Sequence, residues 1–445
     1  MASSRRRFLQ TTAAIGAGVF VGKNRSFGED SKSPNEKVQY ACIGIGGKGD
    51  SDSKDAAAHG TIVAFCDVDS DRREARVKVP GFEAAQRFAD YREMLDKLGD
   101  KIDAVTVSTP DHHHAPAAAM AMKMGKACFC QKPLTHTVWE ARKLAKIAEE
   151  KKLATQMGNQ GTSEPALRKA AALLKKDFIG AIKEVHVITN RPVWAQGGPR
   201  PPKAEVPKNL DWDLWLGPAP ERDYGPGYHP FAWRGWWDFG TGALGDMACH
   251  TFNLPFAGVG LANPTSIQAW TTGHNRDSYP QKSKIRFEFK KGDNIVPVWW
   301  YDGGNKPDYQ PMLGDYKFKG NSGAIIVGEK YTLYSAGDYG GEFVVLDKGK
   351  PVDLPDVEWE KSPGHFTEFH ETILGKRASA MSNFANYAGP LTETILLGNL
   401  AVFAAAEGES PKIEWNAEKL EAVGHPELQK IVNKEYRGQW GAPLA

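Results

Sequence analysis

Residues 38–67 of the chain read VQYACIGIGGKGDSDSKDAAAHGTIVAFCD. The apolar stretch 40–43 runs into a glycine-rich turn, and a second apolar stretch, 61–66, ends at Asp67. The turn contains three spaced glycines: Gly44, Gly46 and Gly49. Two apolar stretches joined in this way predict a strand, a turn, a helix and a second strand. Such a unit is typical of a parallel α/β sheet.

Each glycine of this turn has a separate physical role. Gly44 permits the tight turn, Gly46 lets backbone amides approach a pyrophosphate, and Gly49 lets the helix pack closely on the strand. The helix N-terminus then faces the anion. The segment therefore predicts a bound nicotinamide dinucleotide, and the alternative is a glycine-rich turn in another α/β protein.

Asp67 ends the second strand, close to the roughly 20-residue offset at which a carboxylate accepts hydrogen bonds from the adenosine ribose. The same carboxylate would repel the 2′-phosphate of NADP, so we expect NAD. Two basic residues close in the sequence, Arg72 and Arg73, oppose this preference.

Length and composition limit the remaining possibilities. A chain of 445 residues exceeds the size at which one core stops growing, which predicts two domains. The apolar fraction of 41% and the charged fraction of 25% are those of a soluble globular protein. The formal net charge of +2 provides no basic field for nucleic acid, so a nucleic-acid partner is not expected.

The N-terminus has the pattern of an export signal. The sequence SRRRFL at 4–9 precedes an apolar stretch, 11–21, which is too short for a stable membrane span. This order resembles a twin-arginine signal, a route that carries folded proteins. We expect residues 1–35 to be an export signal and linker, with the protein in the periplasm or cell envelope. The alternative is a basic disordered tail.

The five cysteines form no CxxC pair, and their odd number argues against a disulfide framework. All but Cys249 lie in apolar stretches that predict buried strands. We interpret them as small apolar residues of the core: Cys42, Cys66, Cys128, Cys130 and Cys249.

Strand and helix patterns continue to alternate after residue 67. We expect helices at 87–98, 115–125 and 140–152, and strands at 103–108, 126–131 and 154–157. This alternation predicts a doubly wound parallel sheet with right-handed crossovers. The first domain, a Rossmann dinucleotide-binding domain, is expected over residues 36–160.

The composition changes after a linking helix at 167–178. Successive strand patterns separated by turns predict a largely antiparallel sheet: 183–189, 266–272, 285–289, 294–300 and 323–327. A buried helix is expected at 391–406. Residues 161–445 are therefore expected to form a substrate-binding α/β domain, with a Pro/Trp-rich loop at 191–230.

Aromatic residues are concentrated in and after this loop. Their flat faces suit the C–H face of a sugar and suit loop anchoring equally well. We expect one or two of them to line a sugar site and the others to pack: Trp194, Trp212, Trp215, Tyr228, Trp233, Trp236, Trp237, Trp299, Trp300 and Tyr301.

Four motifs together resemble the Gfo/Idh/MocA oxidoreductases: the glycine turn, STPDHHH at 108–114, QKP at 131–133 and GALGDMACH at 242–250. The resemblance covers nearly all of the chain after the signal. It implies a Rossmann domain followed by an open, mainly antiparallel α/β domain. It also implies hydride exchange between NAD or NADP and a hydroxyl of a sugar or cyclitol, a step that some members use to cleave glycosides.

Asp246 and His250 are four positions apart, so on a helix they share one face. A carboxylate beside an imidazole orients it and raises its proton affinity, as a general base requires. From the residues alone, a buried structural pair or two metal ligands are open alternatives. The resemblance favours the general base.

Lys132 follows a predicted parallel strand, at the edge where ligands bind in such sheets. Its ammonium can stabilise negative charge on a reacting oxygen, whereas a solvent-facing lysine is the alternative. The resemblance favours the catalytic role. Gln131 occupies a position where the family usually has Glu, and without that carboxylate we expect Lys132 to lose its proton more easily.

The resemblance also places further residues at the cofactor: Thr109, Pro110, His114, Gln131 and Lys132. Consecutive histidines do not converge on one point, so the run His112, His113 and His114 does not predict a three-ligand metal site, and we expect no metal.

Three functions are consistent with these residues. The first is an exported NAD(P)-dependent oxidoreductase acting on a carbohydrate hydroxyl, with tightly bound cofactor. The second is a redox-neutral glycosidase that works by transient oxidation. The third is a cofactor-bound sugar sensor without turnover, which the joint presence of Lys132, Asp246 and His250 disfavours. A homo-oligomer is compatible with the sequence.

Overall fold

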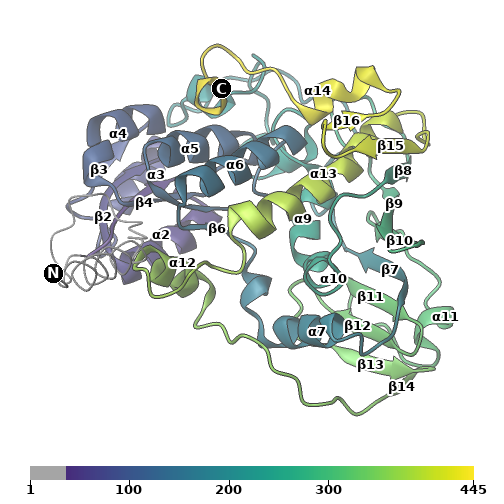
Figure 1. The fold of residues 1–445 in the computed structure, drawn as a ribbon. Coiled ribbons are helices and arrows are strands. Elements are labelled where there is room, and N and C mark those ends of the chain that lie inside the picture. Colours follow the sequence, from purple (N-terminus) through teal and green to yellow (C-terminus); the bar gives the residue numbers. More distant parts are fainter. Residues whose placement is uncertain (1–36) are drawn as a thin grey trace, which may run out of the picture.

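The computed structural model describes residues 37–445, which contain two sheets (Figure 1). The export signal and linker predicted for residues 1–35 lie outside these residues. The first sheet is parallel and has the order β3-β2-β1-β4-β5-β6, which confirms the Rossmann prediction. Its strands are β1 (Gln39–Ile43), β2 (Thr61–Cys66), β3 (Gln86–Phe88), β4 (Ala104–Val107), β5 (Ala127–Cys130) and β6 (Thr155–Met157).

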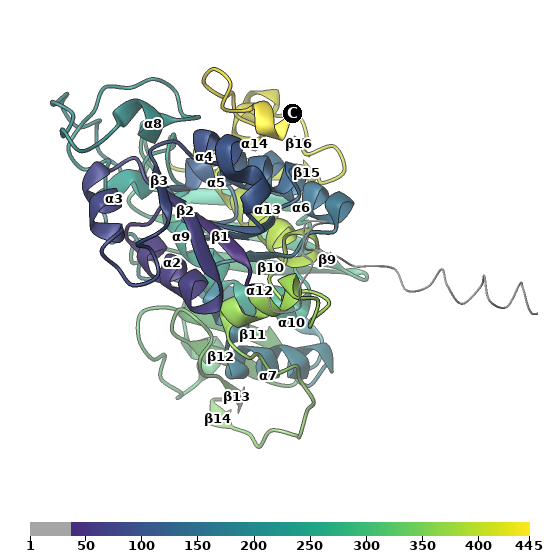
Figure 2. The same ribbon diagram turned by 90° about the vertical axis from the view of Figure 1, so that its left-hand side faces the viewer.

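Five helices connect these strands: α2 (Lys48–His59), α3 (Ser70–Arg76), α4 (Tyr91–Leu98), α5 (Asp111–Lys123) and α6 (Val138–Lys151). Side chains such as Leu95, Met122 and Leu144 pack α4, α5 and α6 on one face of the sheet. The opposite face is covered by α2 together with α12 (His365–Ile373), which returns from far along the chain (Figures 1 and 2).

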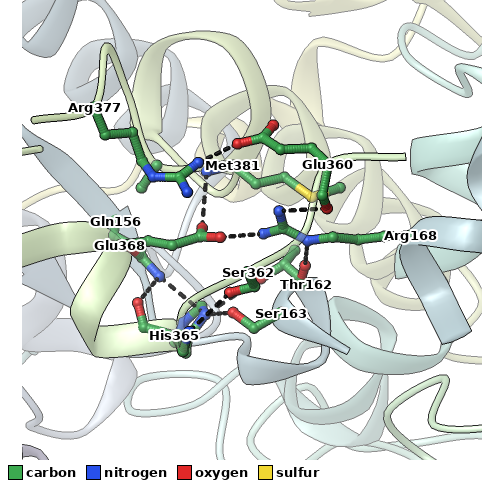
Figure 3. A network of polar contacts seen from close by, with 12 residues as sticks. Gln156, Thr162, Ser163, Arg168, Glu360, Ser362, His365, Glu368, Arg377 and Met381 are labelled. Atoms are coloured by element: carbon green, nitrogen blue, oxygen red, sulfur yellow. Dashed lines mark hydrogen bonds and ion pairs between the residues drawn. The ribbon is translucent and has the colours of Figure 1, made fainter. Parts of the chain in front are cut away.

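Helix α12 is attached by a buried polar network (Figure 3). Arg168 Nη2 of α7 (Pro165–Lys175) donates to Glu368 Oε1 of α12 at 2.5 Å, and both side chains are buried. Arg168 Nε also donates to the Thr162 carbonyl at 2.7 Å, while His365 Nε2 lies 2.9 Å from the Met157 carbonyl. Because a buried charge needs its partner, this network fixes α12 beside β6.

The second sheet has ten strands in the order β14-β13-β12-β11-β7-β10-β9-β8-β15-β16. Its paired strands are antiparallel except β7 and β10, so the expected open, mainly antiparallel sheet is confirmed. The strands are β7 (Ile182–Ile188), β8 (Ser266–Thr271), β9 (Ser283–Lys291), β10 (Asn294–Tyr301), β11 (Gly323–Gly328), β12 (Thr332–Ala336), β13 (Val344–Asp347), β14 (Lys350–Pro351), β15 (Ile413–Asn416) and β16 (Glu421–Ala422).

Helix α13 (Gly389–Ala404) packs on β8 and β9 and also contacts α6 of the Rossmann layer. Its side chains join those of both sheets in one continuous apolar core, to which Leu397 and Phe287 belong. The remaining helices are α8 (Trp212–Leu216), α9 (Gly242–Thr251), α10 (Asn253–Val259), α11 (Gln310–Leu313) and α14 (Gln429–Val432).

Two element predictions were wrong in part. The helix expected at 87–98 begins only at Tyr91, because β3 occupies its first residues. Helix α5 begins at Asp111, four residues before the expected start, so the three histidines belong to its first turn. Pro110 precedes the helix and ends the loop after β4.

All five cysteines are buried and free of disulfides, which confirms their interpretation as core residues. Between residues 37 and 445, no helix is both long and apolar enough to span a bilayer.

Candidate active site

A cavity of about 580 Å³ lies where the carboxyl ends of β1, β2, β4 and β5 meet residues of the second half of the chain. The carboxyl edge of a doubly wound sheet is where ligands bind in such folds. The lining of the cavity includes the glycine turn and Asp67, which define the cofactor end, and Lys132 and α9, which define the catalytic end. The predicted cofactor and catalytic residues, except Gly49 and His114, thus line a single cavity.

The glycine turn fits a dinucleotide. Gly44 has φ +78°, and a Cβ atom there would lie 2.6 Å from the Ser108 carbonyl oxygen. A Cβ at Gly49 would overlap the Gly44 carbonyl, and one at Gly46 would strike the Arg72 guanidinium. The backbone clashes at Gly44 and Gly49 mean that only glycine leaves room there for the turn and the close start of α2.

Asp67 lines the cavity at the end of β2. Its Oδ2 accepts from the Ile45 amide at 3.1 Å, and its Oδ1 accepts from the Asp69 amide at 3.0 Å. Nη1 of Arg72, which also lines the cavity, lies 3.9 Å from Asp67 Oδ2. The carboxylate is held rigidly where a ribose would bind, with one cation beside it.

The motifs after β4 and β5 form the opposite wall. Thr109, Pro110 and Gln131 line the cavity, whereas His114 lies behind the wall. Its ring nitrogens face the carbonyl oxygens of Pro133 at 2.7 Å and Thr109 at 2.8 Å. His114 thus joins the two loops from behind the cavity wall.

Asp52 of α2 was not predicted and supports the same wall. It is buried, and its Oδ2 accepts from Ser108 Oγ at 2.7 Å and from Gln131 Nε2 at 2.8 Å. It also pairs with Lys48. An aspartate in a helix gives no sequence signal for this role, because its partners come from two distant loops.

Lys132 and Asp246 form an ion pair at the other end of the cavity. Lys132 Nζ donates to Asp246 Oδ1 and to the Asp246 carbonyl, both at 2.8 Å. Asp246 and His250 lie one turn apart on α9, as expected. However, the expectation that the carboxylate orients the imidazole was wrong, because its hydrogen-bond partners are Lys132 and Arg234.

The Lys132–Asp246 ion pair also changes what was expected from Gln131. Asp246 supplies Lys132 with the carboxylate that the sequence motif lacks, whereas Gln131 turns to Asp52. The argument that Lys132 is left without a neighbouring negative charge was therefore wrong.

Charges in this region set the protonation of the site. Burial opposes ionisation of Asp246, but Lys132 and Arg234 outweigh it and lower its pKa to about 2. Burial, followed by the charge of Lys132, lowers the pKa of His250 well below 6.5. His250 is therefore neutral at pH 7, the form that accepts a proton.

His250 also has unused hydrogen-bonding capacity. Its Nδ1 is buried and has no hydrogen-bond partner among residues 37–445. The ring lies 4.8 Å from the Tyr339 ring, edge to face, and both residues line the cavity. Because the residue lines the cavity, a ligand bound there can contact the His250 ring.

Two arginines in the cavity were missed by sequence reasoning. Arg234 Nε lies 3.2 Å from Asp246 Oδ1, and Arg191 Nε lies 3.8 Å from Asp246 Oδ2. Both come from segments without regular hydrophobic periodicity, so no sequence pattern indicates where their side chains point.

The aromatic residues divide into two groups. Trp194, Trp215 and Trp233 line the cavity, as do Phe231 and Trp440, which were not singled out from the sequence. The others pack elsewhere. Trp212, Tyr228 and Trp236 belong to a small aromatic core of the 191–230 loop and the residues after it. Trp237 stacks on Tyr279, Trp300 is buried in the core of the second sheet, and Trp299 stacks between Trp270 and Tyr301.

No three His, Cys, Asp or Glu side chains within residues 37–445 converge in a way that could hold a metal ion. His112 and His113 both face the Trp215 carbonyl, at 3.0 and 2.9 Å. They attach α5 to α8.

The arrangement suits hydride transfer from an alcohol. When bound, a nicotinamide dinucleotide would accept or return a hydride at the wall formed by Thr109, Pro110 and Gln131. Lys132 Nζ can donate a hydrogen bond to the reacting oxygen and stabilise its negative charge. Neutral His250 can accept the hydroxyl proton.

Two family profiles match the two halves of the chain that meet at this cavity. Residues 38–159 match the profile of an oxidoreductase family with an NAD-binding Rossmann fold. Residues 181–442 match the profile of the C-terminal α/β domain of the same family. The chain belongs to the Gfo/Idh/MocA family. Membership explains why the glycine turn and the Lys132 loop occur in one chain with the α9 motif.

Several Gfo/Idh/MocA relatives are sugar enzymes by name. A D-xylose 1-dehydrogenase [NADP(+)] of Haloarcula marismortui is 27% identical over 177 residues, 39% of this chain and 48% of the relative. A glycosyl hydrolase family 109 protein of Solibacter usitatus is 33% identical over 162 residues, 33% of this chain and 36% of the relative. The chain thus matches half or less of the length of these relatives.

Solved structures with the same fold include an inositol dehydrogenase homolog of Azotobacter vinelandii complexed with NADH and myo-inositol. It has a TM-score of 0.58 and 17% identity, and covers 86% of this chain and 98% of that one. The WlbA dehydrogenase of Bordetella pertussis, in complex with NADH and UDP-GlcNAcA, has a TM-score of 0.57 and 17% identity. The match covers 84% of this chain and 99% of that one.

Proposed function

We propose that this protein is an NAD-dependent oxidoreductase that transfers a hydride between the cofactor and a hydroxyl of a sugar or sugar derivative. The observation that carries the proposal is the convergence of Lys132, Asp246 and His250 at one end of the cavity whose other end is the glycine turn. A D-xylose 1-dehydrogenase and an inositol 2-dehydrogenase among its relatives are named for reactions of this kind.

In the oxidative direction, His250 would accept the proton of the substrate hydroxyl, and NAD, when bound, would supply the hydride acceptor. Lys132 donates a hydrogen bond to the oxygen throughout and so stabilises the developing alkoxide. Asp246 balances the charge of Lys132 and fixes its Nζ at 2.8 Å. The reverse reaction uses the same groups in the opposite order.

The cavity wall supports tight retention of the cofactor. Trp440, near the C-terminus, lines the cavity and lies under the Arg92 guanidinium, 3.6 Å from its carbon. Trp215 and His229, both from the 191–230 loop, line the same cavity. Residues distant in the sequence would thus surround a dinucleotide bound at the glycine turn.

A retained cofactor favours a second candidate, a redox-neutral glycosidase. Oxidation of a ring hydroxyl to a ketone acidifies the neighbouring C–H, the glycosidic group is then eliminated, water adds, and the hydride returns to the ring. The similarity to a glycosyl hydrolase family 109 protein supports this candidate. It also suits an exported enzyme, because no cytosolic NAD pool would reload it.

Two measurements test the proposal. Mass spectrometry of the denatured, purified protein should detect NAD. Incubating the protein with candidate glycosides, without added NAD, should then separate the candidates. Many turnovers without net NADH support the glycosidase, and a single burst at 340 nm that resumes only with NAD supports a dehydrogenase. If the protein binds sugar but neither cleaves glycosides nor forms NADH, it would instead be a sensor.

Retention itself is tested with Trp440→Ala, which removes the aromatic wall. We expect the fraction of protein that purifies with NAD to fall several-fold, whereas Trp299→Ala, a half-buried tryptophan outside the cavity, should retain it. Equal NAD content in both variants would show that Trp440 does not hold the cofactor.

Export through the twin-arginine route is part of the proposal and rests on Arg5 and Arg6. A reporter fused after residue 35 should reach the periplasm, and changing both arginines to lysine should keep it in the cytosol.

A further inference from the structure

The catalytic end of the cavity contains more positive than negative charge. Three cationic side chains, Lys132, Arg191 and Arg234, line it around the carboxylate of Asp246. A single carboxylate balances only one of them, and neutral His250 adds no charge.

One other carboxyl group lies in this part of the cavity. Asp111 is 4% exposed and accepts a hydrogen bond from Thr241 Oγ1 at 2.6 Å, and burial raises its pKa. Even if Asp111 is counted as fully ionised, one positive charge remains unbalanced. The acids at the cofactor end, Asp67 and Asp90, have cations of their own in Arg72 and Arg92.

Both arginines have unused donors. Beyond its contact with Asp246, Arg191 donates through Nη1 to the Asn190 side chain, and Arg234 donates through Nη1 to the Phe231 carbonyl at 3.5 Å. The Nη2 atom of neither arginine forms a hydrogen bond to any residue from 37 to 445. Each guanidinium therefore retains free N–H groups next to the cavity.

The Arg234 guanidinium is held in place by stacking. Its carbon lies 4.2 Å from the centre of the Trp233 ring and 5.3 Å from that of Phe231. A stacked guanidinium loses little entropy when it binds a planar oxyanion. The same aromatic rings provide an apolar wall suited to the C–H face of a sugar.

We propose that the substrate is a sugar acid, whose carboxylate binds Arg191 and Arg234 while its reacting hydroxyl lies between Lys132 and His250. This inference rests on the proposed function and adds a substrate class to it. The carboxylate supplies the one negative charge that the cavity lacks, and it accepts from the guanidinium donors that the protein leaves free.

The test compares matched pairs of sugars on the NAD-loaded full-length protein. Glucuronate and glucose, and their methyl glycosides, differ only in the carboxylate, and glucose 6-phosphate tests a different anion. We expect kcat/KM to favour the acid by about tenfold to a hundredfold, the range of a charge-assisted hydrogen-bond pair. Preference for the neutral sugar or for the phosphate would overturn the proposal.

Arg191→Gln and Arg234→Gln should each reduce this preference toward unity, and Arg234→Lys, which keeps the charge, should restore part of it. Arg87→Gln, an exposed arginine paired with Glu74 and outside the cavity, is the matched control and should keep the full preference. Equal losses on acid and neutral sugar would show that the arginines serve the reaction in general and would contradict the proposal. Thermal unfolding checks that each variant is folded.

Calorimetric titration separates this proposal from the proposed function. Glucuronate that binds the wild type more tightly than glucose does, and loses that advantage in Arg234→Gln, supports the sugar acid even if no turnover occurs. Turnover of glucose with no binding advantage for glucuronate would support the oxidoreductase and overturn the sugar acid. Neither binding nor turnover of any sugar would overturn both.

Discussion

Lys132 and Asp246 are 114 positions apart in the sequence, yet the lysine Nζ lies 2.8 Å from the aspartate Oδ1. One residue follows β5 of the Rossmann sheet and the other lies on α9 of the second half of the chain. The ion pair therefore joins the Rossmann half of the chain to α9. It also fixes the ammonium where a reacting hydroxyl would bind.

Removing either the lysine or the base should abolish most of the chemistry. We expect Lys132→Ala and His250→Ala each to reduce kcat by about two orders of magnitude or more, the usual size of a lost electrostatic or acid/base contribution. Binding of NAD, measured by fluorescence titration, should change little, because the glycine turn is untouched. Lys183→Ala, an exposed lysine on β7, serves as the control. Near-normal rates in both active-site variants would refute the assigned roles.

The cofactor preference should depend on Asp67. In Asp67→Asn the repulsion of a 2′-phosphate disappears while Arg72 stays in place, so the ratio of the NADP and NAD dissociation constants should fall about tenfold or more. Titration of apo-protein with each cofactor measures the ratio. Asp71→Asn, an exposed acid on α3, should leave it unchanged. A preference for NADP in the wild-type protein would contradict the assignment of NAD.

Stability should fall as the solution is acidified from pH 7.5 to 6. Burial lowers the pKa of His112, His136 and His250, so below about pH 6.5 the unfolded chain binds protons that the folded chain excludes. Their stabilising contribution is complete above the unfolded pKa and is lost as the pH falls. Three such groups should reduce the free energy of unfolding by about 2 kcal/mol at pH 6, measured by urea denaturation. A flat or rising free energy over this interval would contradict the prediction.

Activity should survive chelation. A divalent cation at Asp246 would meet the charges of Lys132, Arg191 and Arg234, and Lys132 already supplies the positive charge that a metal would provide. Dialysis against EDTA should therefore leave the rate unchanged. Loss of activity that zinc or manganese restores would reassign Asp246 and His250 as metal ligands.

Local patterns were sufficient to predict most of the Rossmann layer. The strand at 61–66 and the role of Gly44 follow from residues that are adjacent in the chain, because strand burial and turn geometry are set over a few positions. The helix expected at 87–98 was wrong at its start, since the three residues of β3 are too few to produce a period of two.

Contacts between distant segments could not be predicted in the same way. The i, i+4 spacing placed Asp246 and His250 on one helix face, but it gave no information about which cation would approach the carboxylate. Arg191 and Arg234 lie outside regular helices and strands, where side-chain direction depends on the tertiary fold. The motifs therefore predicted many of the residues that line the cavity, whereas the ion pairs of Asp246 depend on the tertiary fold.

The return of α12 to the Rossmann sheet has a consequence for biosynthesis. A nascent chain that has emerged from the ribosome as far as β6 has all six strands of the parallel sheet, but it lacks Phe366 and Phe369, which cover Tyr40 and Phe129. Arg168, which follows β6, would also lack its partner Glu368 until α12 has emerged. The cofactor-binding half therefore matures only when most of the chain has been translated. We therefore expect stable dinucleotide binding to begin only after α12 has been translated.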